Sequence, residues 1–270
     1  MHVLNMLQLC TGLPNVVQLA ATGDDAIGLA QLAVSAALLT SFVAAVSITE
    51  IQESVALDRV WCRKGFWTAI HTACAGLAGI HSRDLVHGDI KVDNVLISRD
   101  MSSCTICDLG LAAKTTKGIC KYGTLGFRAP ELAERLAASS ALVGEAAQLA
   151  DVWAMGVTVM CFAVRRRCLF DRDESAADPA ARGDNYDIMQ QLFHAQANLH
   201  RGLRRSGKGG NLWTFKACRD VHLEAMPAER EEQWQALWKW LANSALASQA
   251  RDRSGALTAA QVLRARGADG

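Results

Sequence analysis

One stretch just past the middle of the chain restricts the fold more than any other. In residues 151–163, DVWAMGVTVMCFA, Asp151 is the only charged side chain, and the residues after it are apolar on every face of a helix. Such a helix belongs in the middle of a domain, where other elements cover it on all sides. With 270 residues, half of them hydrophobic, the chain is long enough to provide that cover.

The rest of the chain contributes shorter signals. Helical spacing of apolar residues and short apolar runs between turn residues predict two more helices and four strands. The helices are predicted at residues 64–81 and 229–241, and the strands at residues 16–19, 27–32, 95–97 and 104–107, the last two as a hairpin. We therefore expect an α+β domain that is mostly helical, with a little antiparallel sheet near its start.

Charge and cysteine content exclude several classes of protein. The net charge is +1, with five acidic and no basic residues in residues 1–58 and 28 basic and 22 acidic residues after them. No block of like charge is present, which argues against a nucleic-acid partner. The nine cysteines, an odd number, do not suggest a disulfide framework, so we expect a reduced intracellular compartment, cytoplasmic or nuclear.

Residues 26–49 contain no charged side chain, and these 24 residues are long enough to span a bilayer. Polar residues such as Gln31 and Ser35 dilute the segment, and basic residues are missing at both ends. The N-terminus also lacks the basic region of a signal peptide. We expect neither a membrane span nor a cleaved signal peptide.

Two short motifs resemble ligand sites but lack the context that such sites need. Cys104 and Cys107 form a C-x-x-C pattern without a second pair, and in a strand they face opposite sides, so we expect no metal or redox role. Residues 202–209, GLRRSGKG, nearly match a P-loop, but the last position is glycine and no buried strand precedes it. We interpret them as a basic surface loop, and a docking surface for acidic substrates is equally compatible.

The stretch LVHGDIKVDNVLI, residues 85–97, places polar residues between two apolar clusters. The polar residues are His87, Asp89, Lys91, Asp93 and Asn94. Because the stretch follows a predicted helix and precedes the predicted hairpin, it is a loop held by rigid elements, and such loops often carry function. A surface turn with incidental charges is the alternative, but it leaves unexplained why Asp108 follows the hairpin, which can return it beside Asn94.

Oxygen ligands from Asn94 and Asp108 would suit Mg²⁺ with bound phosphates. Asp89 beside them could accept a proton from a hydroxyl group. Lys91, two residues further on, could neutralise charge on a phosphoryl group during its transfer. The pattern favours phosphoryl transfer.

These motifs and three others, in this order, resemble the eukaryotic protein kinase family. Residues 87–94 resemble the catalytic loop, 108–110 the DFG motif with Leu for Phe, 123–131 the end of the activation segment through A-P-E, 151–156 the start of the central helix, and Arg253 the late arginine that pairs with the A-P-E glutamate. The resemblance implies a single protein kinase-like domain over residues 1–270. Residues 1–33 would form part of a truncated N-lobe sheet, and residues 34–270 a mostly helical C-lobe.

The resemblance also implies roles for single residues. Asp89 would orient the substrate hydroxyl and accept its proton, Lys91 would contact the γ-phosphate of ATP, and Thr124 would help to place the substrate. Asn94 and Asp108 would hold Mg²⁺.

Two residues would contact the adenine of ATP. Leu96 would form the floor beneath it, and Ala33 would belong to a hinge, residues 31–33, whose backbone meets its edge. Lys91 and the G-T-x-x-F-x-A-P-E pattern resemble kinases that phosphorylate serine or threonine of protein substrates.

Two contacts should brace this fold if the resemblance holds. Asp151 would hydrogen-bond the backbone around residues 87–88, and Glu131 would pair with Arg253. Gly88 departs from the family, because it stands where an arginine usually grips a phosphorylated activation loop. Switching by phosphorylation of Thr115, Thr116 or Tyr122 would therefore lose its usual receiver.

A larger departure concerns the start of the chain. Residues 13–17 resemble the junction between helix C and the next strand. The resemblance then implies that the family's glycine-rich loop and ATP-binding lysine would lie further upstream, outside this sequence. We expect the chain alone to be a weak or inactive kinase. Three functions stay open: an N-terminally incomplete serine/threonine kinase, a kinase-like binding module without catalysis, and a small-molecule phosphotransferase.

Overall fold

The computed structural model describes residues 2–21, 39–40, 45–47, 64–98, 101–119, 123–129, 131–132, 140–164 and 255. Several predictions lie outside these residues: the strand at 27–32, the helix at 229–241, the basic segment at 202–209, and the roles of Ala33, Tyr122 and Arg253.

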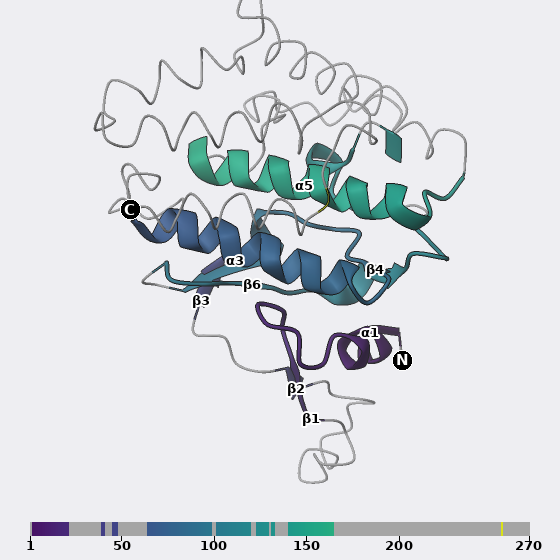
Figure 1. The fold of residues 1–270 in the computed structure, drawn as a ribbon, viewed down its shortest axis with the longest axis horizontal. Helices are drawn as coiled ribbons and strands as arrows, with labels where there is room; N and C mark the ends of the chain where they lie inside the picture. Colours follow the sequence, from purple (N-terminus) through teal and green to yellow (C-terminus); the bar gives the residue numbers. More distant parts are fainter. Residues whose placement is uncertain are drawn as a thin grey trace, which may run out of the picture.

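Two long helices lie next to each other across the molecule (Figure 1). α3 spans Lys64–His81, the bounds that apolar periodicity predicts. α5 spans Gly144–Val164 and contains the predicted central helix, but it begins seven residues earlier. Its first two turns, GEAAQLA, consist mostly of good helix formers without the continuous apolar pattern that marks the rest. The side chains of residues 151–159 are all buried, as expected for a central helix.

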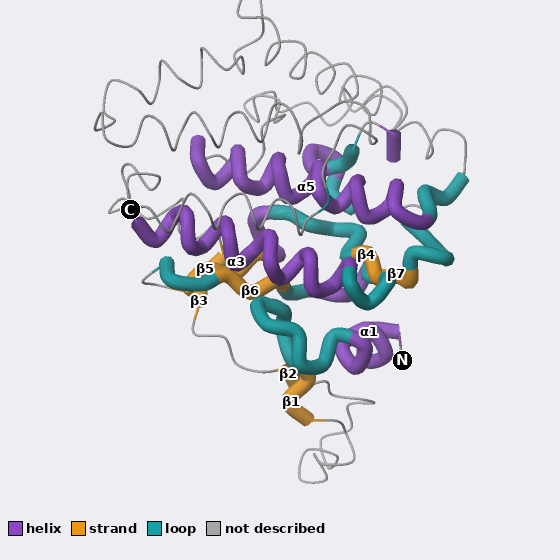
Figure 2. Tube along the Cα trace, in the orientation of Figure 1, coloured by secondary structure: helices purple, strands orange, loops and turns teal. Residues whose placement is uncertain are grey.

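A small antiparallel sheet packs against α3, on the side away from α5 (Figure 2). Its strand order is β3 (Ala45–Ser47), β5 (Val95–Ser98) and β6 (Cys104–Ile106). β5 and β6 form the predicted hairpin, with Leu96 opposite Thr105. Two more antiparallel pairs join β1 (Leu19–Ala21) to β2 (Leu39–Thr40) and β4 (Leu85–Val86) to β7 (Ala113–Lys114).

The strand predicted at residues 16–19 is displaced in the structure. Leu19 begins β1, whereas Val16 forms an isolated parallel bridge with Ile106, and the Val17 N–H donates to the Ile106 carbonyl at 2.9 Å. The two valines therefore lie along the β6 edge of the sheet. Their side chains are buried in the same core as Ile106.

The core joins these layers. Phe66 on α3 and Phe162 on α5 lie with ring centroids 5.1 Å apart. Gly76 on α3 allows a close approach, because a Cβ there would lie 2.6 Å from the Asn15 carbonyl oxygen. The loop after α1 (His2–Leu9) can therefore rest directly on α3.

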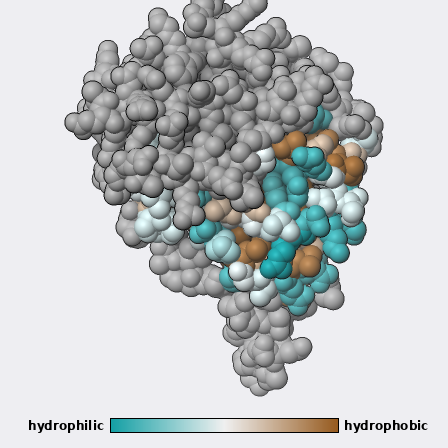
Figure 3. Space-filling view, in the orientation of Figure 1, coloured by the Kyte–Doolittle hydropathy of each residue, from teal (hydrophilic) through white to brown (hydrophobic). Residues whose placement is uncertain are grey.

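On the face in Figure 3, hydrophilic and apolar residues are interspersed over the part of the surface that the structure describes. In the described part of the chain, the large apolar side chains that are exposed include Leu9, Leu111 and Val143. Among the described residues, no helix is long and apolar enough to cross a membrane.

Candidate active site

The loop that carries the polar cluster is hydrogen-bonded to α5 through its backbone. Asp151, buried on α5, accepts hydrogen bonds from the His87 N–H at 2.7 Å (Oδ2) and the Gly88 N–H at 2.9 Å (Oδ1). Its Oδ2 also lies 3.1 Å from Nε2 of His81, in the last turn of α3. The predicted contact between Asp151 and the backbone of residues 87–88 is confirmed.

His87 connects this loop to the end of the hairpin. Its buried ring accepts the Asp89 N–H at Nδ1, at 3.2 Å, so the ring proton lies on Nε2, which donates to the Cys107 carbonyl at 2.9 Å. This bridge is a positioning contact that the sequence did not reveal, since it depends on where the hairpin returns.

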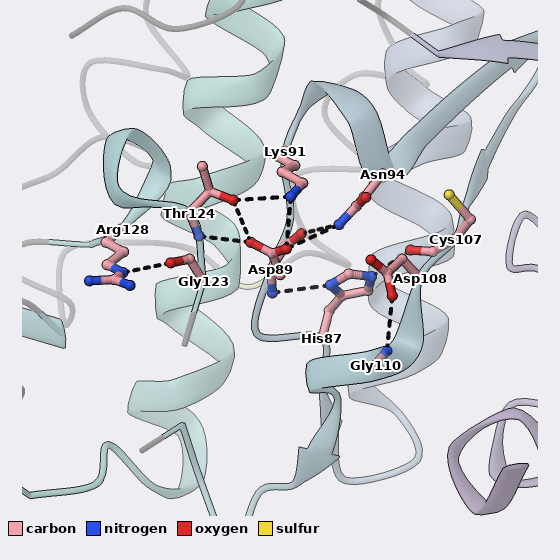
Figure 4. Close-up of polar contacts among 10 residues, drawn as sticks. All are labelled: His87, Asp89, Lys91, Asn94, Cys107, Asp108, Gly110, Gly123, Thr124 and Arg128. Atoms are coloured by element: carbon pink, nitrogen blue, oxygen red, sulfur yellow. Dashed lines mark hydrogen bonds and ion pairs between the residues drawn. The ribbon is translucent and has the colours of Figure 1, made fainter. Parts of the chain in front are cut away.

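Asp89 is the residue on which the side-chain contacts of the loop converge (Figure 4). Its Oδ1 accepts from the Thr124 N–H at 2.8 Å and the Thr124 hydroxyl at 2.9 Å. Its Oδ2 lies 3.1 Å from Lys91 Nζ, which also donates to the Thr124 hydroxyl at 3.2 Å. The structure therefore brings together three residues that the sequence predicts at the site, although Thr124 is distant in the chain.

Burial and hydrogen bonding shift the pKa of the Asp89 carboxyl group in opposite directions. Burial raises the pKa of Asp89, but the hydrogen bonds from Thr124 and Lys91 and the charge of Lys91 outweigh it, so its pKa lies below the ordinary value. Asp89 is therefore an ionised acceptor over the whole neutral range.

The hairpin returns Asp108 to the neighbourhood of Asn94, because the Cys107 N–H donates to the Asn94 carbonyl at 3.0 Å. The Asn94 side chain donates through Nδ2 to the Asp89 carbonyl at 2.8 Å and to Asp89 Oδ2 at 3.3 Å. Asp108 has a left-handed backbone, with φ 61°, and its exposed side chain accepts from the Gly110 N–H at 3.2 Å.

One amide and one carboxylate fit Mg²⁺, which binds few protein oxygens and keeps several waters. Because Asn94 uses its Nδ2 towards Asp89, its Oδ1 is the atom that would face a metal. The described residues hold no cluster of three or more His, Cys, Asp and Glu side chains suited to a more demanding metal.

The two residues predicted to contact adenine are Leu96 and Ala33. Leu96 is half-buried on β5, on the face opposite to the buried Val95 and Ile97. Ala33 lies outside the described residues.

Two glycines allow close backbone contacts around Asp89, and Gly123 brings its segment directly against Gly88. Gly88 and Gly123 both have positive φ, 79° and 102°. A Cβ on Gly123 would lie 2.8 Å from the Gly88 carbonyl oxygen, and one on Gly88 would lie 3.0 Å from the Leu111 carbonyl oxygen. Thr124 is therefore delivered to Asp89 by backbone packing.

Arg128 lies near the site, and the sequence did not single it out. Its Nε donates to the Gly123 carbonyl at 2.8 Å, and its half-buried side chain lines a cavity of about 20 Å³ together with Asp89 and Thr124. Burial lowers the pKa of Arg128, and the charge of Asp89 opposes that shift.

Comparisons with known proteins show which family the chain resembles as a whole. The family described as "Protein kinase domain" matches residues 4–261. The chain is 30% identical over 162 residues to serine/threonine-protein kinase TAO3 of Xenopus laevis, and 34% identical over 167 residues to the mitogen-activated protein kinase kinase mkk2 of Aspergillus fumigatus. It is 31% identical over 97 residues to the membrane-associated tyrosine- and threonine-specific cdc2-inhibitory kinase of Drosophila melanogaster.

These relatives are longer than the region of similarity. The alignments cover 59%, 60% and 35% of this chain, and 15%, 30% and 16% of TAO3, mkk2 and the cdc2-inhibitory kinase. The chain thus spans less than a third of the length of each.

Proposed function

Since this chain belongs to the family of protein kinase domains, we propose that it transfers the γ-phosphoryl group of ATP to serine or threonine hydroxyls of protein substrates. One observation carries the proposal: an ionised, half-buried Asp89 whose two oxygens are held by Thr124 and Lys91. The names of TAO3 and mkk2 support the kinase activity, and that of TAO3 also supports the serine/threonine class.

In the proposed reaction, Asp89 accepts a hydrogen bond from the substrate hydroxyl and directs the hydroxyl oxygen at the γ-phosphorus of ATP. A bond forms between these two atoms while the bond to the leaving ADP oxygen breaks, and the hydroxyl proton passes to Asp89. Because the contacts with Thr124 and Lys91 that orient Asp89 also lower its pKa, we propose that orientation of the hydroxyl is its larger contribution. Thr124 keeps the carboxylate in this orientation.

Positive charge is proposed to come from two sources. Lys91 Nζ, 3.1 Å from Asp89, would stabilise charge on the transferring phosphoryl group. Asn94 and Asp108 would hold Mg²⁺, which when bound neutralises the phosphate oxygens.

We propose that Leu96 lies beneath the adenine of ATP and that the backbone of Ala33 meets its edge, as the resemblance to the family implies. The proposed division into a partial N-lobe, residues 1–33, and a C-lobe, residues 34–270, falls at residues outside the described part.

The test is phosphate transfer from radiolabelled ATP to a generic protein substrate, with analysis of the labelled amino acids. Asp89→Asn should lower the rate by roughly 10²-fold or more, because the hydroxyl loses its charged acceptor. Asp84→Asn is the matched control: Asp84 is exposed, and its φ of 55° is one that asparagine tolerates well. Transfer that survives Asp89→Asn unchanged, or label found only on small molecules, would contradict the proposal.

A further inference from the structure

A groove lies between α1 and β7, away from the residues that contact Asp89. Its volume is about 500 Å³, within the roughly 300–1,000 Å³ of clefts that bind ligands. In Figure 2, α1 lies next to the β4–β7 pair. The side chains that define this α1–β7 groove come from α1, from β7 and from the turn after β7: His2, Met6, Leu9, Ala113, Lys114 and Lys117.

The wall of the groove that α1 provides is largely apolar. Met6 and Leu9 are three residues apart, so they share one face of the helix. Met6 is buried, whereas Leu9 is one of the exposed large apolar side chains. Together they offer an apolar contact to a side chain that enters from solvent.

The opposite wall is positively charged. Lys114 is exposed on β7, and among the described residues its ammonium has no hydrogen-bond or ion-pair partner. Lys117 is exposed as well, but it already interacts elsewhere, so Lys114 is the cation that matters most here. No acidic side chain of the described part of the chain lines the groove, so nothing there offsets this charge.

A protective role for Lys114 is the competing explanation. Lysines on short strands at a sheet edge discourage pairing with other chains, and β7 is such a strand. That role needs only a charge on the strand. It does not account for the apolar wall that faces Lys114 across a groove large enough for a side chain.

We propose that the α1–β7 groove binds an acidic segment of a partner protein. An apolar side chain of this segment lies against Met6 and Leu9, and a neighbouring Asp or Glu pairs with Lys114. α1 has 8 residues and is about 12 Å long, which about four residues of an extended peptide cover. A small inorganic anion would leave the apolar wall uncovered, and an anionic membrane is attracted by larger basic clusters than two lysines.

The experiment selects binders for the full chain from a random octapeptide library that lacks serine, threonine and tyrosine, so that no peptide can be a phosphate acceptor. The selected peptides should combine Asp or Glu with Leu, Ile, Met or Phe. Their affinities are then measured by fluorescence anisotropy without ATP. Lys114→Glu should weaken binding by about five- to tenfold, because it replaces the attraction of one charge pair by a repulsion. Leu9→Ser should weaken it by about fivefold through loss of apolar contact.

Arg83→Glu is the matched control, because Arg83 is exposed, lies outside the groove and changes the net charge by the same amount. It should leave the affinities within about twofold. Selected peptides without acidic residues, or affinities that Lys114→Glu and Leu9→Ser leave unchanged, would overturn the inference. Binding of inorganic phosphate or of phosphatidylserine vesicles that needs Lys114, with no peptide selected, would overturn it too.

The inference does not depend on the proposed kinase function, and the two can fail separately. Peptide binding that requires Lys114 and Leu9, in a chain that transfers no phosphate, would support the groove and contradict the kinase proposal. Phosphate transfer by a chain that selects no acidic peptide would overturn the groove alone.

Discussion

Asp89 shows how several weak effects set the state of one carboxyl group. Burial alone would favour the neutral acid, yet two donors from Thr124 and the ammonium of Lys91 favour the anion more strongly. The same contacts that orient Asp89 therefore keep it charged.

This balance predicts how stability depends on pH. Because the folded-state pKa of Asp89 lies below its ordinary value of 3.8, its ionised form stabilises the fold above that value. The contribution is lost as pH falls through the lower folded-state pKa. Urea unfolding of the wild type and of Asp89→Asn between about pH 3 and pH 7 should give a free-energy difference that is constant near neutrality and shrinks in acid. A difference that grew on acidification would mean that burial dominates.

At the scale of elements, backbone contacts hold residues 113–119 against the rest of the domain. The segment after Asp108 pairs through β7 with β4, the Thr115 N–H donates to the Asp84 carbonyl at 2.8 Å, and Ile119 bridges to Leu142. These contacts dock residues 113–119 without a phosphate group, which is consistent with glycine at position 88.

The contact between Gly123 and Gly88 can be tested with a matched pair of variants. Gly123→Ala should lower kcat by about tenfold, because its Cβ would lie 2.8 Å from the Gly88 carbonyl and push Thr124 away from Asp89. It should also lower the unfolding free energy by about 1–3 kcal/mol. Gly12→Ala has a similar positive φ, 79°, but open space around its Cβ, so it should lose stability with kcat unchanged. Equal kcat in the two variants would show that the close approach does not matter for activity.

The same elements show what the sequence could predict. The bounds of α3 follow from its apolar spacing, since one of its faces is buried along its whole length. The start of α5 could not be predicted in this way. Residues 144–150 lack the continuous apolar pattern of the rest of the helix, so helix propensity is the only signal that separates them from a loop. Val16 and Val17 look like the start of a strand, yet their partner, Ile106, is distant in the sequence.

The candidate site divides in the same way. Asp89, Lys91, Asn94, Asp108 and Thr124 stand in ordered motifs, so the sequence predicts them, and the structure brings Lys91, Asn94 and Thr124 onto Asp89. His87 and Arg128 act through carbonyl groups of Cys107 and Gly123. A carbonyl group leaves no signal in a sequence, so such contacts appear only once the backbone is folded.

Across the molecule, Asp151 ties three elements together. Its buried carboxylate contacts the end of α3 through His81 and the candidate catalytic loop through the N–H groups of His87 and Gly88. Asp151→Asn should lower the unfolding free energy by about 2–4 kcal/mol, since an amide offers one acceptor where two buried donors need one each.

Gln148→Ala is the control for that measurement. Gln148 lies on the same helix and donates once, to the His81 carbonyl at 2.9 Å, so its loss should cost about 1 kcal/mol in urea unfolding. If the two variants were equally stable, Asp151 would not be the common anchor that its contacts suggest.

The anchoring by Asp151 also limits how the molecule can move. If residues 87–88 opened while α5 stayed in place, two N–H groups would lose their acceptor inside the core, and the Asp151 carboxylate would keep only its contact with His81. Residues 87–88 therefore have no inexpensive local fluctuation, and in the proposed reaction they would keep their shape from one turnover to the next. Slow rearrangements that admit a substrate and release a product would then occur in segments that do not touch Asp151, and the timing of the proposed cycle would be set away from Asp89.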